Sequence, residues 1–122
     1  MRPPRAPAAR PDRHASYNAS VSAILNADLH CHSSVSDGTL EPEALAARAR
    51  ANGVELWALT DHDEVGGQQR ARDTALALGL RYLTGVEISV SFAGTTVHIV
   101  GLGYELDDAG LSAGLEQVRG GR

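Results

Sequence analysis

The sequence contains no lysine and a single cysteine, and only 4% of its 122 residues are aromatic. One cysteine excludes an internal disulfide and fits a reducing cytoplasm, which is the location we predict. With so few aromatic side chains, Ala, Leu and Val must fill any core. No apolar run approaches the ~18 residues of a membrane span, and the arginine-rich start lacks the apolar segment of a signal peptide, so we expect no membrane partner.

The charge and length narrow the class of protein further. The formal net charge is -4, so no global basic field would draw the chain to nucleic acid, and we expect no stable binding of duplex DNA. A content of 43% hydrophobic and 21% charged residues is typical of a globular protein. The length corresponds to one domain at most.

The first part of the chain differs in composition from the rest. Residues 1–20 carry four of the five prolines and four arginines but few large apolar side chains. Such a segment cannot offset the entropy lost on ordering, so we predict a disordered tail over residues 1–22. Residues 23–122 would form the domain.

Strand and helix patterns alternate from residue 24 onward. We predict strands over 24–32, 54–60, 81–92 and 95–106, and helices over 42–53, 66–79 and 107–122. Pro42 suits the first helical position, Asp107 or Asp108 suits a cap, and Ala93-Gly94-Thr95 suits a hairpin turn. The alternation predicts an α/β fold with mostly parallel strands plus one hairpin.

Two histidines stand one residue apart in the first predicted strand. Side chains at alternate positions of a strand share one face, so His30 and His32 would point one way and Cys31 the other. The pair could therefore converge on one ion, although one buried and one exposed histidine would give the same pattern. Cys31 would serve packing.

Further polar side chains follow the later strands. Asp61, His62 and Asp63 come at the end of the second strand, on the same rim as the end of the preceding strand, where acidic residues beside a histidine suit divalent cations. Asp63 or Glu64 could instead cap the next helix. In that alternative Asp61 would simply be exposed at a turn.

Glu87 and His98 occupy the two arms of the predicted hairpin. A carboxylate within the apolar segment GVEISV is costly to bury unless it is paired or bound to metal. His98 could provide that partner across the hairpin, because side chains on one face of neighbouring strands lie within reach. Imidazole and carboxylate donors without paired cysteines indicate open sites for Zn, Mn or Fe.

The motifs DLHCHSSVSDGT, LTDHDEV, GVEIS and HIVGLGY, taken in order, resemble the opening motifs of the PHP (polymerase and histidinol phosphatase) superfamily of metal-dependent phosphoesterases. Within it, the closest likeness is to bacterial nucleoside-3′,5′-bisphosphate phosphatases, some of which also act as 5′-to-3′ exoribonucleases. The resemblance implies the N-terminal part of a distorted (β/α)7 TIM-like barrel with up to three divalent metal ions at its mouth.

The resemblance also implies roles for particular residues. His30 and His32 would bind one ion, Glu87 would bridge it to a second ion that His98 also holds, and Asp37 and His62 would bind the third. Asp63 would support His62 from behind, and Ser34 or Ser36 could donate hydrogen bonds to phosphate. The sequence stops at Arg122, before the later histidine and the Asp-x-His motif of the family, so we expect an incomplete domain.

The expected reaction is hydrolysis of a phosphomonoester by metal-activated water. The implied partner is a small phosphorylated nucleotide, either a 3′,5′-bisphosphate or a short RNA end. Alternatives are a non-catalytic metal-binding or interaction module and, among enzymes, a histidinol-phosphate phosphatase or a DNA 3′-5′ exonuclease. A chain ending at Arg122 could also be an inactive fragment of a longer enzyme.

Overall fold

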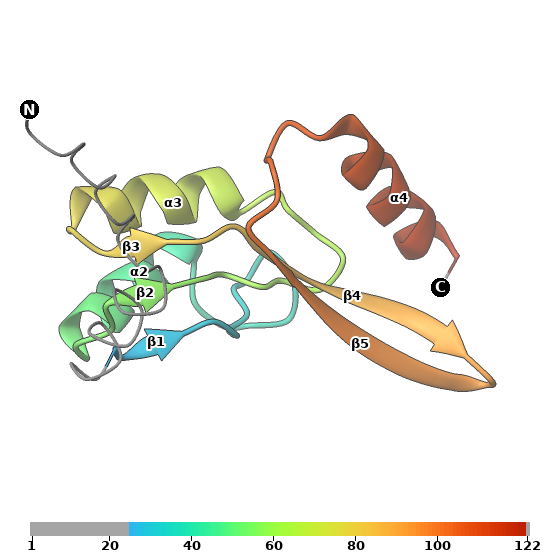
Figure 1. The fold of residues 1–122 in the computed structure, drawn as a ribbon, viewed down its shortest axis with the longest axis horizontal. Coiled ribbons are helices and arrows are strands. Elements are labelled where there is room, and N and C mark those ends of the chain that lie inside the picture. Colours follow the sequence, from blue (N-terminus) through green and yellow to red (C-terminus); the bar gives the residue numbers. More distant parts are fainter. Residues whose placement is uncertain (1–24, 122) are drawn as a thin grey trace, which may run out of the picture.

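The computed structural model describes residues 25–121, and the predicted tail over residues 1–22 lies outside this range. The described chain forms two sheets and three helices (Figure 1). The strands are β1 (Ala27–Asp28), β2 (Leu56–Trp57), β3 (Arg81–Tyr82), β4 (Gly85–Phe92) and β5 (Thr95–Leu102), and the helices are α2 (Pro42–Ala51), α3 (Gln68–Ala77) and α4 (Ala109–Gly120). No helix in this range is long and apolar enough to cross a membrane.

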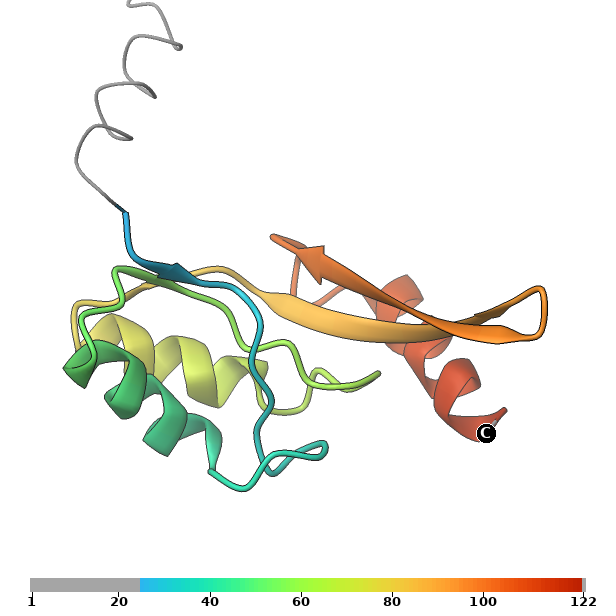
Figure 2. The same ribbon diagram turned by 90° about the horizontal axis from the view of Figure 1, so that it is seen from below.

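The first three strands form a parallel sheet in the order β1-β2-β3. Helices α2 and α3 connect these strands and lie side by side on one face of the sheet (Figure 2). The predicted α/β class with parallel strands is confirmed by this arrangement. Closure into a barrel stays a prediction.

The core lies between this sheet and its two helices. Small alanines on the helices let them approach the sheet, and Trp57 supplies the one large aromatic side chain at the centre, 1% exposed. Its ring packs at a tilt against Tyr82, with 5.4 Å between centroids. The buried cluster consists of Ala46, Ala49, Val54, Trp57, Leu59, Ala71, Ala75 and Leu80. Apart from Trp57, it has the Ala, Leu and Val composition expected from the sequence.

The helix boundaries follow local signals in the sequence. Pro42 begins α2, and Gly53 and Gly79 follow α2 and α3 with φ angles of +80° and +72°. Asp108 caps α4 by accepting a hydrogen bond from the amide of Leu111 at 2.9 Å. These predicted helix starts and stops are therefore confirmed to within two residues.

The prediction of one strand over 81–92 is wrong. The chain pairs with β2 as far as Tyr82, then breaks and continues from Gly85 as β4 in a second sheet. Gly85 passes so close to the preceding strand end that a Cβ would lie 2.5 Å from the carbonyl oxygen of Leu59. The chain can change partners here because glycine has no side chain to collide.

Strands β4 and β5 form the second sheet, an antiparallel hairpin that extends away from the parallel sheet (Figure 1). Its two-residue loop contains Ala93 and Gly94, both with positive φ, as type I′ turns require. Thr95 already belongs to β5, so the predicted turn was one residue too long. Glu87 lies opposite Val100, and His98 lies opposite Ser89.

We predict opposite effects for two glycine-to-alanine substitutions. Gly85→Ala should lower the free energy of unfolding by about 1–3 kcal/mol, because the new methyl group collides with backbone that cannot move freely. Gly114→Ala, in open space on α4, should raise it by about 0.5–1 kcal/mol through helix propensity. Urea unfolding followed by circular dichroism measures both, and equal stabilities would contradict the crowding at residue 85.

Candidate metal centre

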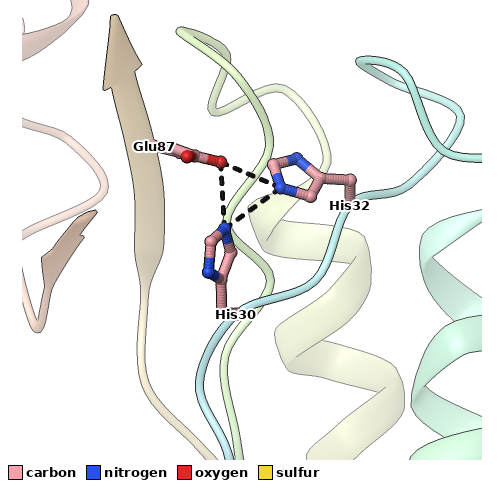
Figure 3. Close-up of side chains that lie close together, drawn as sticks. All are labelled: His30, His32 and Glu87. Atoms are coloured by element: carbon pink, nitrogen blue, oxygen red, sulfur yellow. Dashed lines mark hydrogen bonds and ion pairs between the residues drawn. The ribbon is translucent and has the colours of Figure 1, made fainter. Parts of the chain in front are cut away.

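Glu87 is the buried carboxylate around which four histidines gather. The residue is 6% exposed, and its Oε2 atom lies 3.0 Å from His30 Nε2 and 2.9 Å from His32 Nε2 (Figure 3). Nδ1 atoms of His62 and His98 lie 3.7 and 3.8 Å from its two oxygens. The histidines come from three segments that are distant in sequence.

The surroundings of Glu87 favour its charged form. Burial by itself would raise the pKa of this carboxyl, but the hydrogen bond from His30 and the positive charge available on His62, His30 and His32 outweigh it. The pKa of Glu87 is therefore held below its usual range. An ionised carboxylate is also the form that binds cations.

Asp37 forms a second group with two of the same histidines. Its carboxylate oxygens lie 3.5 Å from His32 Nδ1 and 3.3 Å from His62 Nε2. The rings of His32 and His62 stack, with 4.3 Å between centroids. All six residues that the sequence singled out as ligands thus lie in one continuous cluster.

The separations between donor atoms fit ligands of a single ion. His30 Nε2 and His32 Nε2 are 3.2 Å apart and close a triangle with Glu87 Oε2 (Figure 3). Two N or O ligands bound at ~2.0 to 2.2 Å with ordinary angles lie roughly 2.8 to 3.6 Å apart. Three triads have donor atoms within 4.8 Å of one another: His30, His32 and Glu87; His32, Asp37 and His62; His62, Glu87 and His98. These groups could hold divalent metal ions.

Local backbone geometry aims His30 and His32 at this cluster. The regular strand ends at Asp28, earlier than predicted. Beyond it, the amide of Cys31 donates to the hydroxyl of Thr60 at 3.1 Å instead of to a backbone carbonyl of the neighbouring strand. The chain stays extended, so side chains still alternate. The Cys31 sulfur accepts from the Trp57 indole at 3.2 Å on the core side, as its predicted packing role requires.

Asp61, which the sequence placed on the rim with His62 and Asp63, has a structural role that the sequence did not predict. Its side chain is completely buried, which rules out the exposed turn considered for it. It accepts hydrogen bonds from the Ser33 amide at 2.6 Å, the Ser33 hydroxyl at 2.6 Å and the Ser36 hydroxyl at 2.7 Å. These bonds hold the loop that carries Asp37. The sequence feature that could have indicated this role is the serine-rich loop, because its donors need an acceptor where the loop is buried.

The two serines that could have contacted phosphate are engaged elsewhere. The Ser34 hydroxyl donates to Glu41 at 2.8 Å, and the Ser36 hydroxyl donates to Asp61. Each hydroxyl has one proton to donate. In the structure, neither serine therefore has a proton left for a phosphate oxygen.

Asp63 joins the loop after β2 to the hairpin. Its amide donates to the Glu87 carbonyl at 2.9 Å, and its carboxylate accepts from the Ser89 amide at 2.8 Å. Arg119, a second residue missed in the sequence, donates from α4 to the Asp63 carbonyl oxygen. Neither Asp63 nor Glu64 caps α3, whose N-cap is Gly67 without a side-chain hydrogen bond. Support of His62 by Asp63 stays a prediction.

A cavity of about 370 Å³ opens beside the cluster. Ser36, Asp37, His62, Ser89 and His98 line it. The Ser89 hydroxyl lies 3.2 Å from His98 Nδ1 and steadies that ring. The cavity therefore borders two of the three candidate metal groups and has room for a small anion.

The fold and this cluster define an α/β protein with imidazole and carboxylate donors beyond the ends of β1 and β2 and on the hairpin. The family model of the PHP domain matches residues 28–109, and the chain belongs to this family.

Two curated relatives are similar over most of this chain. It is 50% identical over 99 residues to the 3′,5′-nucleoside bisphosphate phosphatase of Chromobacterium violaceum, covering 81% of this chain and 35% of that protein. It is 44% identical over 92 residues to a 5′-3′ exoribonuclease of Haemophilus influenzae, covering 75% and 34%. The chain thus spans about a third of the length of these relatives.

Solved structures share the fold. One is an amidohydrolase from Chromobacterium violaceum with bound sulfate and no metal, 49% identical with a TM-score of 0.77, over 80% of this chain and 34% of that one. Another is a putative metal-dependent phosphoesterase from Bifidobacterium adolescentis, 31% identical with a TM-score of 0.75, over 81% and 35%.

We predict that Asp61→Asn lowers the free energy of unfolding by about 1–3 kcal/mol, because an amide cannot accept from all three buried donors. Asp73→Asn is the matched control, since that exposed carboxylate accepts only from Gln69 on its own helix. The control should stay within about 0.5 kcal/mol of the parent chain. Equal urea midpoints for the two variants would contradict a structural role for Asp61.

The single thiol should be unreactive in the folded, metal-free chain. Burial raises the pKa of Cys31 to about 11, and the Trp57 hydrogen bond offsets this only in part. In EDTA at pH 8, alkylation by iodoacetamide should be at least about a hundredfold slower than in the urea-unfolded chain.

The raised pKa of Cys31 also predicts how the stability of the fold changes with pH. The folded state holds the thiol proton more tightly, so the protonated thiol contributes to the free energy of unfolding. This contribution is complete below pH 9 and is lost as pH rises toward 11. Alkylation with equal rates in the folded and unfolded chain would contradict the burial of the thiol.

Proposed function

We propose that this chain contributes the site of a metal-dependent phosphoesterase that hydrolyses a phosphomonoester of a nucleotide, either a 3′,5′-bisphosphate or a short RNA end. The observation that carries the proposal is the convergence of four imidazoles on one buried carboxylate, Glu87, next to a cavity with room for a phosphate group. The barrel architecture and the cytoplasmic location remain predictions that accompany it.

The residues present suit up to three divalent ions, with Mn, Zn or Fe as the expected metals. His30 and His32 would hold one ion, Glu87 would bridge to a second that His98 also holds, and Asp37 and His62 would hold a third. His32 and His62 each belong to two of the observed triads, which supports a shared cluster over separate sites. The donors are nitrogen and oxygen without thiolate, as such metals accept.

The protein groups define where a substrate phosphate would lie. When bound, the ions would act as Lewis acids that lower the pKa of water and offset charge on the phosphoryl oxygens. Ser89 fixes the ring of His98 at the cavity wall, and the Asp61 hydrogen bonds fix the loop of Asp37. The ions would also explain how a chain of net charge -4 accepts an anion.

The relatives support this choice of substrate. The Chromobacterium protein is named for nucleoside bisphosphates and the Haemophilus protein for RNA. The amidohydrolase neighbour contains sulfate, a tetrahedral anion of the same shape as phosphate. Because the chain spans about a third of these relatives, the activity of the whole protein belongs to the proposal.

The test is metal-dependent release of phosphate from adenosine 3′,5′-bisphosphate. We expect phosphate release with Mn²⁺, none with EDTA, and a loss of more than about a hundredfold for His30→Ala, beyond the effect typical of groups that only orient ligands. His14→Ala is the matched control, because it removes the one histidine outside the proposed ligand set.

Two results would overturn the proposal. Equal rates for the His30 and His14 variants would show that the cluster is not used. Metal bound at the cluster without hydrolysis of any phosphoester would instead favour a non-catalytic metal-binding module. Metal content is measured by mass spectrometry on the same preparations.

A further inference from the structure

A second, larger cavity lies between the hairpin and α4. It measures about 570 Å³, within the range of pockets that bind small organic ligands. Strands β4 and β5 supply three hydroxyl groups, and α4 supplies an amide. Its lining includes Ser89, Val90, Ser91, Thr96, Gln117 and Val118.

This cavity adjoins the one beside the metal centre. Ser89 and His98 line both of them. The two residues face each other across the hairpin and their side chains are 3.2 Å apart, so they form the boundary between the cavities. A ligand anchored at the metal centre could therefore reach past this boundary.

The hairpin register places the polar side chains that line the two cavities on one face. Glu87, Ser89 and Ser91 alternate along β4 and so point to the same side. Ser89 is paired with His98 and Ser91 with Thr96, and directly opposed residues share a face. The face therefore runs from the buried carboxylate toward the hairpin tip and changes from charged to neutral on the way.

The chemistry of the second cavity selects its ligand. Among the described residues that line it, His98 is the one titratable group, and no arginine or carboxylate is present. Among these described residues a run of phosphates would find no arginine to bind, whereas hydroxyl and amide groups can hydrogen-bond a sugar or a base, and Val118 can contact a base.

We propose that this cavity binds the neutral nucleoside part of the substrate while the phosphate lies at the metal centre. The inference rests on the proposed function for the phosphate end, but it assigns new residues to substrate selection. Gln117 offers a donor and an acceptor to the base edge, and Ser91 and Thr96 offer hydroxyls. The site thereby selects a single nucleoside unit next to the reacting phosphate.

Binding of adenosine to the metal-free chain tests this inference without requiring catalysis. In ¹⁵N-labelled chain kept in EDTA, adenosine should cause saturable shifts of the Ser91 and Thr96 amides and of the Gln117 side-chain amide. Gln117→Ala and Thr96→Val should each weaken adenosine binding about three- to tenfold, as expected for the loss of one or two hydrogen bonds.

The matched controls are Gln69→Ala, an exposed glutamine on α3, and Thr95→Val, the neighbour of Thr96 that points to the opposite face. Both should bind adenosine like the parent chain. Absence of saturable shifts at the cavity, or equal affinity for test and control variants, overturns the inference. Loss of phosphate release with adenosine binding intact would overturn only the proposed function.

Discussion

A carboxylate buried where two sheets meet must be matched by hydrogen-bond donors or positive charge, and the arrangement around Glu87 follows from that requirement. Its backbone is fixed first: the Glu87 amide donates to the Asp61 carbonyl at 3.0 Å, and its carbonyl accepts from the Asp63 amide at 2.9 Å. The side chain then faces imidazoles from three segments. The contacts between Glu87 and the imidazoles of the other segments therefore depend on how the hairpin docks beside the end of β2.

Much of the site could be predicted because its logic is local. Alternation along an extended chain places His30 and His32 on one side and Cys31 on the other, even though the regular strand ends at Asp28. The rule that parallel strands end on a common rim brings His62 to the same place. Helix signals such as Pro42 also act within a few residues, so their positions could be read directly.

The features that the sequence did not reveal depend on partners far along the chain. Asp61 looks like any turn aspartate until Ser33 and Ser36 fold over it, and Arg119 meets Asp63 across 56 residues. The break before Gly85 was hidden because the apolar pattern runs on through it. Only the close approach to Leu59 shows why the strand changes sheets there.

The hairpin register constrains how the length of this segment can vary. Glu87 and His98 share a face because Ser89 is paired with His98 and side chains alternate along each arm. One residue inserted into either arm would turn a candidate ligand to the opposite side. Residues added in matched pairs at the Ala93-Gly94 loop would lengthen the hairpin and leave both side chains in place. Length changes in this hairpin are therefore compatible with the cluster when they occur at the tip and involve an even number of residues.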